Sequence, residues 1–382
     1  MKDRITHKGK YLFITSLLGF GILLFYISAA AWGSMVWMSS TVMFYLEQPI
    51  SAKEALSAME WNQKIREKGQ EGEETELLLD FCIWGQEENV TIENKSLSAS
   101  TQADVISLCG NPELLFENCG LPVKEDAKGC VIDEKTAWDL FGSSQVAGKE
   151  IFCEGKSYIV RKVISGKEKI IAFQARQDKK ESQKKDAESG QEVPEQLEKL
   201  PFNRITLRKL ENQSIYDLQS AWNNQYGLPA AILDTELLRG ISGTCLLLLP
   251  FSLCIFFWVY LYHQYKIQDK WQGKAGAAGA AAILLILFLI FWKRWVQIPD
   301  DYIPTKWSNF SFWTNLWETK TEAVRLLIQI PKTNLDSVWI RSFFQTVACS
   351  FLAEVFLITG GLVFTQNIPY AVKSGTKRTG PL

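Results

Sequence analysis

The chain has 382 residues, of which 47% are hydrophobic, and its 41 basic and 42 acidic residues give a formal net charge of -1. This near-neutral balance lacks the basic patch typical of nucleic-acid-binding proteins. Two histidines are too few for a histidine-built metal site. We therefore expect no nucleic-acid partner, no bound metal and no cofactor.

Four apolar segments have the length and composition of membrane spans, at residues 12–38, 241–261, 275–292 and 343–364. A helix needs about 20 mostly apolar residues to cross roughly 30 Å of hydrocarbon. The first segment follows a basic start and contains three consecutive alanines, so a cleaved signal peptide is an alternative. An uncleaved anchor is favoured because apolar residues continue as far as Leu46. The sequence predicts a membrane protein with an α-helical four-span bundle.

The placement of lysine and arginine predicts which segments lie in the cytoplasm. Basic residues precede the first span, connect the second to the third, and follow the fourth. Lys293 and Arg294 contradict this rule, because they follow the third span on the expected outer side. The rule is weaker for long loops and late helices. The expected cytoplasmic parts are residues 1–11, 262–274 and 365–382, and the expected outer parts are residues 39–240 and 293–342.

Residues 39–240 carry mixed strand and helix signals, which predict an α/β extracytoplasmic domain inserted between spans 1 and 2. Ser51 and Glu54 form a capping-box pattern before a helix, and Gly142 is placed to end a helix at residues 133–141. Residues 177–198 have almost no apolar side chains and predict a flexible charged insertion. Strands are expected at residues 77–85, 88–94, 103–108, 129–132, 149–153, 157–164 and 170–173.

Residues 298–317, between the third and fourth spans, are rich in tryptophan and proline. Tryptophan is enriched at membrane–water interfaces. We interpret the segment as a loop at the membrane surface, with Trp307, Trp313 and Trp317 at the interface. A rim that contacts a substrate is the alternative.

The sequence contains none of the motifs that would indicate its own catalytic chemistry. G-x-x-x-x-G-K-[ST], G-x-S-x-G and H-E-x-x-H are all absent. We therefore predict that the chain is not an enzyme, and that any ATP hydrolysis would need another chain.

The predicted cytoplasmic link at residues 262–274 has two interpretations. It is a plain basic connection between helices, or it docks a cytoplasmic protein. In the second case Ile267 and Trp271, spaced four residues apart, would share one helical face. The residues assigned to this docking link are Tyr265, Lys266, Ile267, Gln268, Asp269, Lys270 and Trp271.

Two features within the predicted spans are candidates for special roles. The small residues Gly276, Gly279 and Ala280 would let another helix approach closely. Glu354 is an acid near the middle of the fourth span, where a charge is costly. It is either a hydrogen-bonded or protonated group at a helix contact, which we favour, or a functional group.

Five cysteines lie in the predicted outer domain, where disulfides are permitted. Cys109 and Cys119 would close a short loop, so they are the candidate pair. An odd number leaves at least one thiol over. Unpaired thiols and one or two bridges are about equally consistent with the sequence.

Residues 129–165 resemble a stretch of the outer core domain of MacB/FtsX-type ABC transporter permeases. The resemblance rests on Leu140-Phe141-Gly142 at the end of a short helix, on Gly148-Lys149, and on the strand from Tyr158 to Val163. This motif covers about a tenth of the chain. The order of one anchor, an outer domain and three further spans also resembles the layout of that family. The outer segment before the fourth span is longer than in that family, and the outer domain is shorter.

The resemblance implies a function as well as a layout. Such permeases are dimers in a bacterial plasma membrane that pair with a cytoplasmic ATPase, here on a separate chain. The link at residues 262–274 corresponds to the family's coupling element. The implied mechanism is mechanotransmission or export, in which ATP hydrolysis inside moves the outer domains. The alternative is a membrane-anchored sensor or scaffold that recruits a cytoplasmic protein.

Overall fold

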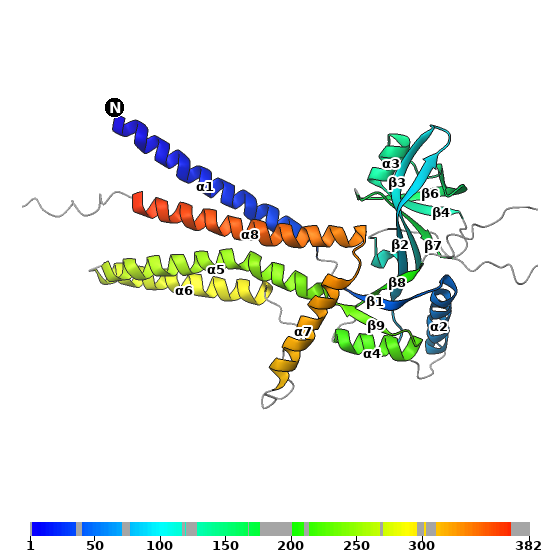
Figure 1. Ribbon diagram of the computed structural model, residues 1–382. Coiled ribbons are helices and arrows are strands. Elements are labelled where there is room, and N and C mark those ends of the chain that lie inside the picture. Colours follow the sequence, from blue (N-terminus) through cyan, green and yellow to red (C-terminus); the bar gives the residue numbers. More distant parts are fainter. Residues whose placement is uncertain are drawn as a thin grey trace, which may run out of the picture. The chain divides into compact units, whose positions relative to one another are not determined.

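The computed structural model divides the chain into two compact units (Figure 1). The helical unit contains Met1–Val36, Leu237–Ile303 and Trp339–Leu382, and the sheet unit contains Trp37–Glu236 and Pro304–Val338. The structure describes residues 2–35, 40–70, 77–116, 119, 128–166, 168–175, 201–209, 214–267, 270–295, 302 and 311–367.

The described strands of the sheet unit form one nine-stranded sheet in the order β3-β7-β4-β6-β5-β2-β8-β1-β9. The pairs β3–β7 and β4–β6 are parallel, and the other paired strands are antiparallel. The strands are β1 (Thr41–Ile50), β2 (Phe81–Asn94), β3 (Ala99–Gly110), β4 (Gly129–Asp133), β5 (Glu150–Cys153), β6 (Lys156–Ile164), β7 (Ile170–Gln174), β8 (Phe202–Arg208) and β9 (Ala230–Leu233).

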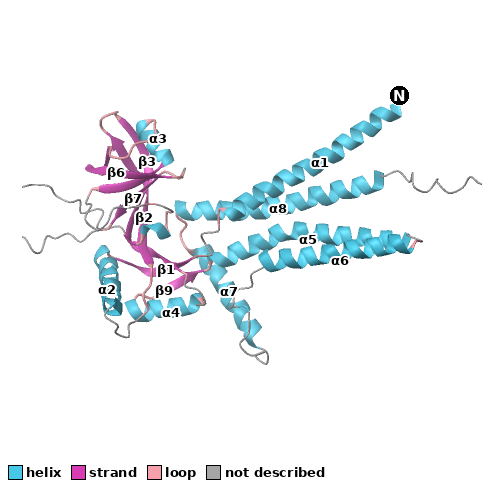
Figure 2. Ribbon diagram, turned by 180° about the vertical axis from the view of Figure 1, so that it is seen from behind, coloured by secondary structure: helices cyan, strands magenta, loops and turns pink. Residues whose placement is uncertain are grey.

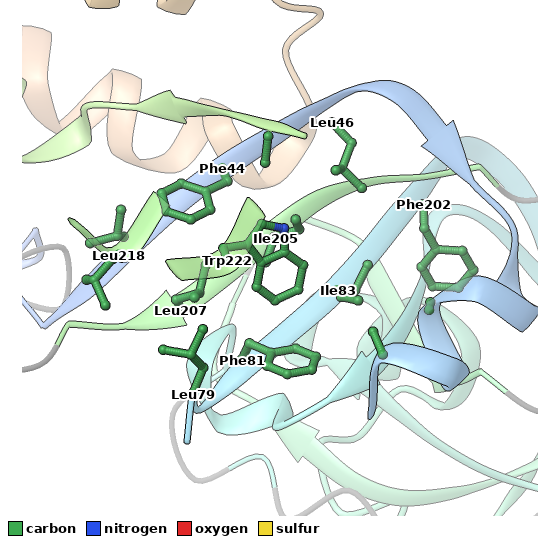
Figure 3. Close-up of a cluster of buried hydrophobic side chains, with 14 of the residues drawn as sticks. Phe44, Leu46, Leu79, Phe81, Ile83, Phe202, Ile205, Leu207, Leu218 and Trp222 are labelled. Carbon is green, nitrogen blue, oxygen red and sulfur yellow. The ribbon is translucent and has the colours of Figure 1, made fainter. Parts of the chain in front are cut away.

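The first face of the sheet carries a hydrophobic core with helices α2 (Ala52–Gln70) and α4 (Ile215–Tyr226). Phe44 of β1 and Phe81 of β2 belong to this core, and the ring of Phe81 meets that of Trp222 edge-on at 5.1 Å (Figure 3). Successive strand residues point to opposite faces. The neighbouring residue Met43 therefore belongs to the core on the second face.

The second face is completed by residues from much later in the chain. Its core contains Trp84 and Ile106 together with Ile330, and Leu326 and Leu335 pack against it. Leu326 comes from the end of α7 (Ser311–Gln329), Ile330 directly follows that helix, and Leu335 lies in the first turn of α8 (Asn334–Asn367). The sheet unit therefore includes most of the chain that separates the third and fourth apolar helices.

Two predicted helix signals in the sheet unit are confirmed. The backbone N of Ser51 donates to Glu54 Oε2 at 2.8 Å, and the Glu54 N donates to Ser51 Oγ at 3.3 Å, which is a reciprocal capping box. Helix α3 (Glu134–Phe141) is capped by Asp133, whose Oδ1 accepts from the Thr136 N. Gly142 ends this helix in the left-handed region, with φ 65°.

The helical unit contains α1 (Lys2–Gly33), α5, which begins at Thr235 and ends at Ile267, α6 (Trp271–Trp295) and most of α8. Within it α1 lies beside α8, and α5 lies beside α6 (Figures 1 and 2). Each has a stretch long and apolar enough to cross a membrane: Leu12–Gly33, Thr235–His263, Trp271–Ile290 and Asn334–Val363.

Three predicted boundaries were wrong. The first helix ends at Gly33, before the predicted end at residue 38, and the apolar residues from Val42 to Leu46 belong to strand β1. The segments predicted as separate strands at residues 77–85 and 88–94 belong to one long strand, β2, which begins at Phe81. Residues 311–317, which were expected to belong to a loop at residues 298–317, form the start of helix α7. Trp307 and residues 177–198 lie outside the described residues.

The candidate disulfide between Cys109 and Cys119 was also wrong. The two side chains belong to the cores on opposite faces of the sheet. The Cys109 Sγ instead donates to the Ala55 carbonyl at 3.4 Å. Among the described cysteines no pair is joined by a disulfide.

Two cysteines of the sheet should be chemically inert while the protein is folded. Burial raises the pKa of Cys82 well above its ordinary value, and burial with nearby Glu154 raises the pKa of Cys153 to about 12. The thiolate is the reactive form, so we expect neither residue to react with iodoacetamide at mildly alkaline pH until denaturant is added. Mass spectrometry of tryptic peptides checks this, with Glu60→Cys on the exposed face of α2 as the reactive control. Rapid labelling of the native residues would contradict the burial described here.

Candidate functional site at the starts of two long helices

Three ion pairs of the sheet unit lie where the chain leaves the sheet for the long helices α5 and α8. We call them the anchor pairs, and they are Arg204–Asp336, Lys320–Asp234 and Lys209–Glu236. Each joins residues that are distant in sequence. Together they define the candidate site.

The first anchor pair is fully buried. The Arg204 Nη2 lies 2.9 Å from the Asp336 Oδ2, and both side chains are 2% exposed. Arg204 is on the inner strand β8, where it faces Tyr45 of β1 and Trp84 of β2 in the sheet register. Its Nη2 also donates to the Pro331 carbonyl at 2.7 Å, and its guanidinium lies 5.3 Å from the centre of the Tyr45 ring. The arginine therefore binds the chain on both sides of the α8 start.

Asp336 has a second role, which is to cap helix α8. Its Oδ2 accepts from the Thr333 N at 3.0 Å, and its own N donates to the Thr333 Oγ1 at 3.2 Å. This reciprocal pattern is a capping box with an aspartate in place of the usual glutamate. A carboxylate at a helix N-terminus also interacts favourably with the helix dipole. One side chain thus fixes both where α8 begins and which strand it is attached to.

The electrostatics of this pair follow from its burial. Burial lowers the pKa of Arg204, and the negative charge of Asp336 opposes that shift. The pKa of Lys332 is likewise lowered by burial, with an opposing effect from Asp336. Arginine nevertheless stays charged in proteins. Removing one partner would leave an uncompensated buried charge, which costs about 3–5 kcal/mol.

A second polar contact ties α8 to the sheet at its first residue. Asp104 of β3 is buried and accepts hydrogen bonds from the Gln86 Nε2 at 2.6 Å and from the Asn89 N at 3.1 Å. The Asn334 Nδ2 also donates to this carboxylate. The first turn of α8 is therefore bonded to both β8 and β3.

The start of α5 is held by the other two anchor pairs. Asp234 directly precedes α5 and accepts from the Lys320 Nζ of α7 at 2.7 Å, with side-chain exposures of 3% and 12%. Glu236, in the first turn of α5, pairs with Lys209 at 2.7 Å, with exposures of 31% and 25%. The α5 start is thus held by one buried pair and one partly solvated pair.

Close contacts within the helical unit come from small residues that the sequence did not single out. The Ser28 Oγ of α1 donates to the Thr346 carbonyl of α8 at 2.9 Å and lies 2.6 Å from the Ser350 Oγ. A Cβ at Gly21 would lie 2.6 Å from the Leu357 Cγ, and one at Gly360 would lie 2.9 Å from a methyl carbon of Leu18. Serine and glycine let α1 and α8 pack closely, as is typical between membrane helices.

The predicted docking link is divided between two helices. Ile267 is the last residue of α5 and Trp271 is the first of α6, so the prediction that they share one helical face was wrong. Trp271 is 81% exposed. Tyr265 and Lys266 lie in the last turn of α5, and Lys270 directly precedes α6. Gln268, Asp269 and the side chain of Ile267 lie outside the described residues.

The other predicted membrane features have few contacts within this chain. A Cβ at Gly276 or Gly279 would meet nothing within 4 Å, and Ala280 is exposed. Their role in helix packing therefore remains a prediction about another chain. Glu354 is half-buried, and it makes no hydrogen bond or ion pair within the part of the chain that the structure describes.

Sequence reasoning missed the residues of the first anchor pair. Two local signals point to them. Arg204 is a charged residue inside a strand otherwise rich in apolar and β-branched residues, and Thr333 and Asp336 have the spacing of a capping box. Neither signal reveals that the two meet, because they are 132 positions apart.

Comparisons with known proteins give limited similarity. No family model and no curated protein matches the chain. The periplasmic region of MacB from Actinobacillus actinomycetemcomitans aligns with 10% identity over 52% of this chain and 91% of that structure, with a TM-score of 0.35. The extracellular domain of the noncanonic ABC-type transporter YknZ from Gram-positive bacteria aligns with 13% identity over 51% of this chain and 100% of that structure, with a TM-score of 0.31. Neither likeness, at such TM-scores, identifies the fold or function of this chain.

We predict that Arg204→Met strongly destabilises the protein. The buried carboxylate of Asp336 would lose its counter-charge, at a cost of about 3–5 kcal/mol. Thermal unfolding of the detergent-solubilised chain, followed by circular dichroism, measures the change. The matched control is Arg208→Met on the same strand, whose pair with Asp80 is exposed and should contribute about 0–1 kcal/mol. Equal losses in the two variants would contradict a special role for the buried pair.

We also predict that Gly21→Ala weakens the packing of α1 on α8. The new methyl group would overlap Leu357, and overpacking of this kind costs about 1–3 kcal/mol. Gly19→Ala, on the same helix but with nothing within 4 Å, is the control and should be neutral or stabilising. The melting temperatures of the two variants in detergent decide the matter, and equal values would contradict the described helix contact.

Proposed function

We propose that this chain is the membrane-embedded permease subunit of an ABC transporter of the MacB/FtsX type. It would couple ATP hydrolysis by a separate cytoplasmic ATPase chain to movement of its sheet unit outside the membrane. The observation that carries the proposal is that α5 and α8 each begin inside the sheet unit, where ion pairs hold their first turns. Long helices attached in this way can pass a movement to the sheet.

The surface of the long helices supports a membrane location. Large apolar side chains such as Phe257 and Val259 of α5, and Ile286 and Ile290 of α6, are about half exposed or more. Exposed apolar area of this extent is unfavourable in water and favourable in lipid. A multi-pass position in a bacterial plasma membrane accounts for it.

The proposed mechanism is mechanical. A helix is stiff along its axis, so displacement at one end of α8 reaches its other end. The Asp336–Arg204 pair would then pass this displacement to β8, and the Asn334–Asp104 hydrogen bond would pass it to β3. In this mechanism a substrate need not cross between the spans.

Two kinds of partner belong to the proposal. The ATPase would contact the link between α5 and α6, where Trp271 presents a large exposed aromatic surface. Exposed aromatic residues are common anchors of protein interfaces. A second permease chain would complete a homo- or heterodimer, and the open side of α6 at Gly276 and Gly279 is one face that could receive it.

A specific test uses the exposed tryptophan of the link. We expect Trp271→Ala to abolish the stimulation of a co-purified ATPase by the permease, because a central aromatic anchor of an interface is worth at least 2 kcal/mol. ATP hydrolysis by the complex in nanodiscs is the measurement. Trp138→Ala, which removes an exposed tryptophan from α3 of the sheet unit, should leave the stimulation unchanged.

The outcome also separates the proposal from its alternative. If the purified chain brings down no ATP-hydrolysing partner, or if Trp271→Ala and Trp138→Ala behave alike, the coupling role is wrong. A membrane-anchored sensor or scaffold would then be the better description.

A further inference from the structure

Helix α7 carries an exposed apolar stripe outside the anchor-pair site. Trp313 is 56% exposed, Trp317 is 76% exposed and Ile328 is 71% exposed. With Val324, which is half-buried, these residues are spaced by four, seven and four positions, so they follow one side of the helix. We call this set the α7 stripe.

Two residues of α7 contact the rest of the sheet unit. The Lys320 Nζ pairs with Asp234 and lies 5.7 Å from the centre of the Tyr216 ring of α4. Leu326 packs on the core of the second sheet face. Leu326 lies roughly 180° around the helix from Trp317, whereas Lys320 lies roughly 60° from Trp317 and borders the α7 stripe. None of the four stripe residues belongs to a hydrophobic core of the described sheet unit.

The remaining side of α7 is polar and charged. Glu318, Glu322 and Arg325 lie there, and Glu322 and Arg325 are exposed. At 100° per residue, Glu322 is roughly 140° around the helix from Trp317. The helix thus packs on the sheet core at Leu326, exposes the α7 stripe beside Lys320, and turns a polar side to water.

Chain connectivity and one ion pair join this helix to the first residues of α5 and α8, which carry two proposed membrane spans. Lys320, near the middle of α7, is bonded to Asp234, and α5 begins at the next residue. The apolar run of α5 at residue 241 starts six positions after Thr235, which is roughly 9 Å of helix at 1.5 Å per residue. At its other end, α7 is separated from α8 only by residues 330–333.

We infer that α7 lies along the outer surface of the bilayer and inserts the α7 stripe among the lipid headgroups. Tryptophan favours this region because its ring is apolar while its N–H can still hydrogen-bond. An amphipathic helix in this position buries its apolar side at the boundary between headgroups and acyl chains. Since Lys320 joins α7 to the residue before α5, the lipid surface would act as a support for the sheet unit. The inference rests on the membrane location in the proposed function but not on an ATPase partner.

Spin labels on the full chain in phosphatidylcholine–phosphatidylglycerol nanodiscs test this inference. Trp317→Cys and Ile328→Cys place a nitroxide on the α7 stripe, and Glu322→Cys places one on its polar side. Ile286→Cys on the exposed side of α6 reports the hydrocarbon region. Because Trp317 and Ile328 are largely exposed, their substitution leaves the contacts of α7 with the sheet intact. The wild-type chain, carried through the same labelling, gives the background from native cysteines.

We expect labels at 317 and 328 to collide more often with oxygen than with a water-soluble nickel chelate, as at 286, and the label at 322 to show the reverse. High nickel accessibility at 317 and 328 would overturn the inference, because the stripe would then face water. Low accessibility to both reagents would also overturn it, because protein would then cover the stripe. If the label at 286 is itself accessible to nickel, the membrane location in the proposed function fails instead.

Discussion

The buried pair between Arg204 and Asp336 is the interaction on which the rest of the sheet unit depends. It joins β8, an inner strand, to the first turn of α8, and it is shielded from water on both sides. A buried ion pair contributes little net stability compared with apolar residues, yet it is costly to break. Its effect is therefore positional: α8 cannot slide along β8 without separating two charges in a medium of low polarity.

The same constraint explains why the chain between the third and fourth long helices folds into the sheet unit. With Asp336 fixed, the preceding residues must pass over the second sheet face, where Ile330 fills the core beside Trp84. Helix α7 is then held at its middle by Lys320. The end of this connection, from Leu326 to Leu335, thus contributes to a domain core, while Trp313 and Trp317 stay exposed.

Local signals in the sequence predicted local structure well. The Ser51–Glu54 capping box, the glycine stop at Gly142 and the four apolar helices all depend on residues close together in the chain. Strand β1 was missed because its residues are apolar on both faces, which removes the alternation that marks a half-buried strand and makes it look like an extension of the first span. The anchor pairs could not be predicted because each is set by register and topology, not by spacing.

The two helix starts are attached with unequal stiffness, and this bears on the proposed mechanism. Glu236 of α5 and Lys209 are both partly solvated, and such pairs contribute about 0–1 kcal/mol and tolerate movement. Asp336 is 2% exposed, and its neighbour Asn334 bonds to the buried Asp104. A displacement of α8 would therefore move the sheet with little loss, whereas α5 is held by the buried Asp234–Lys320 pair just before its first residue and by a solvated pair that can rearrange in water. In a permease of the proposed kind, α8 would transmit force to the sheet and α5 would guide its motion.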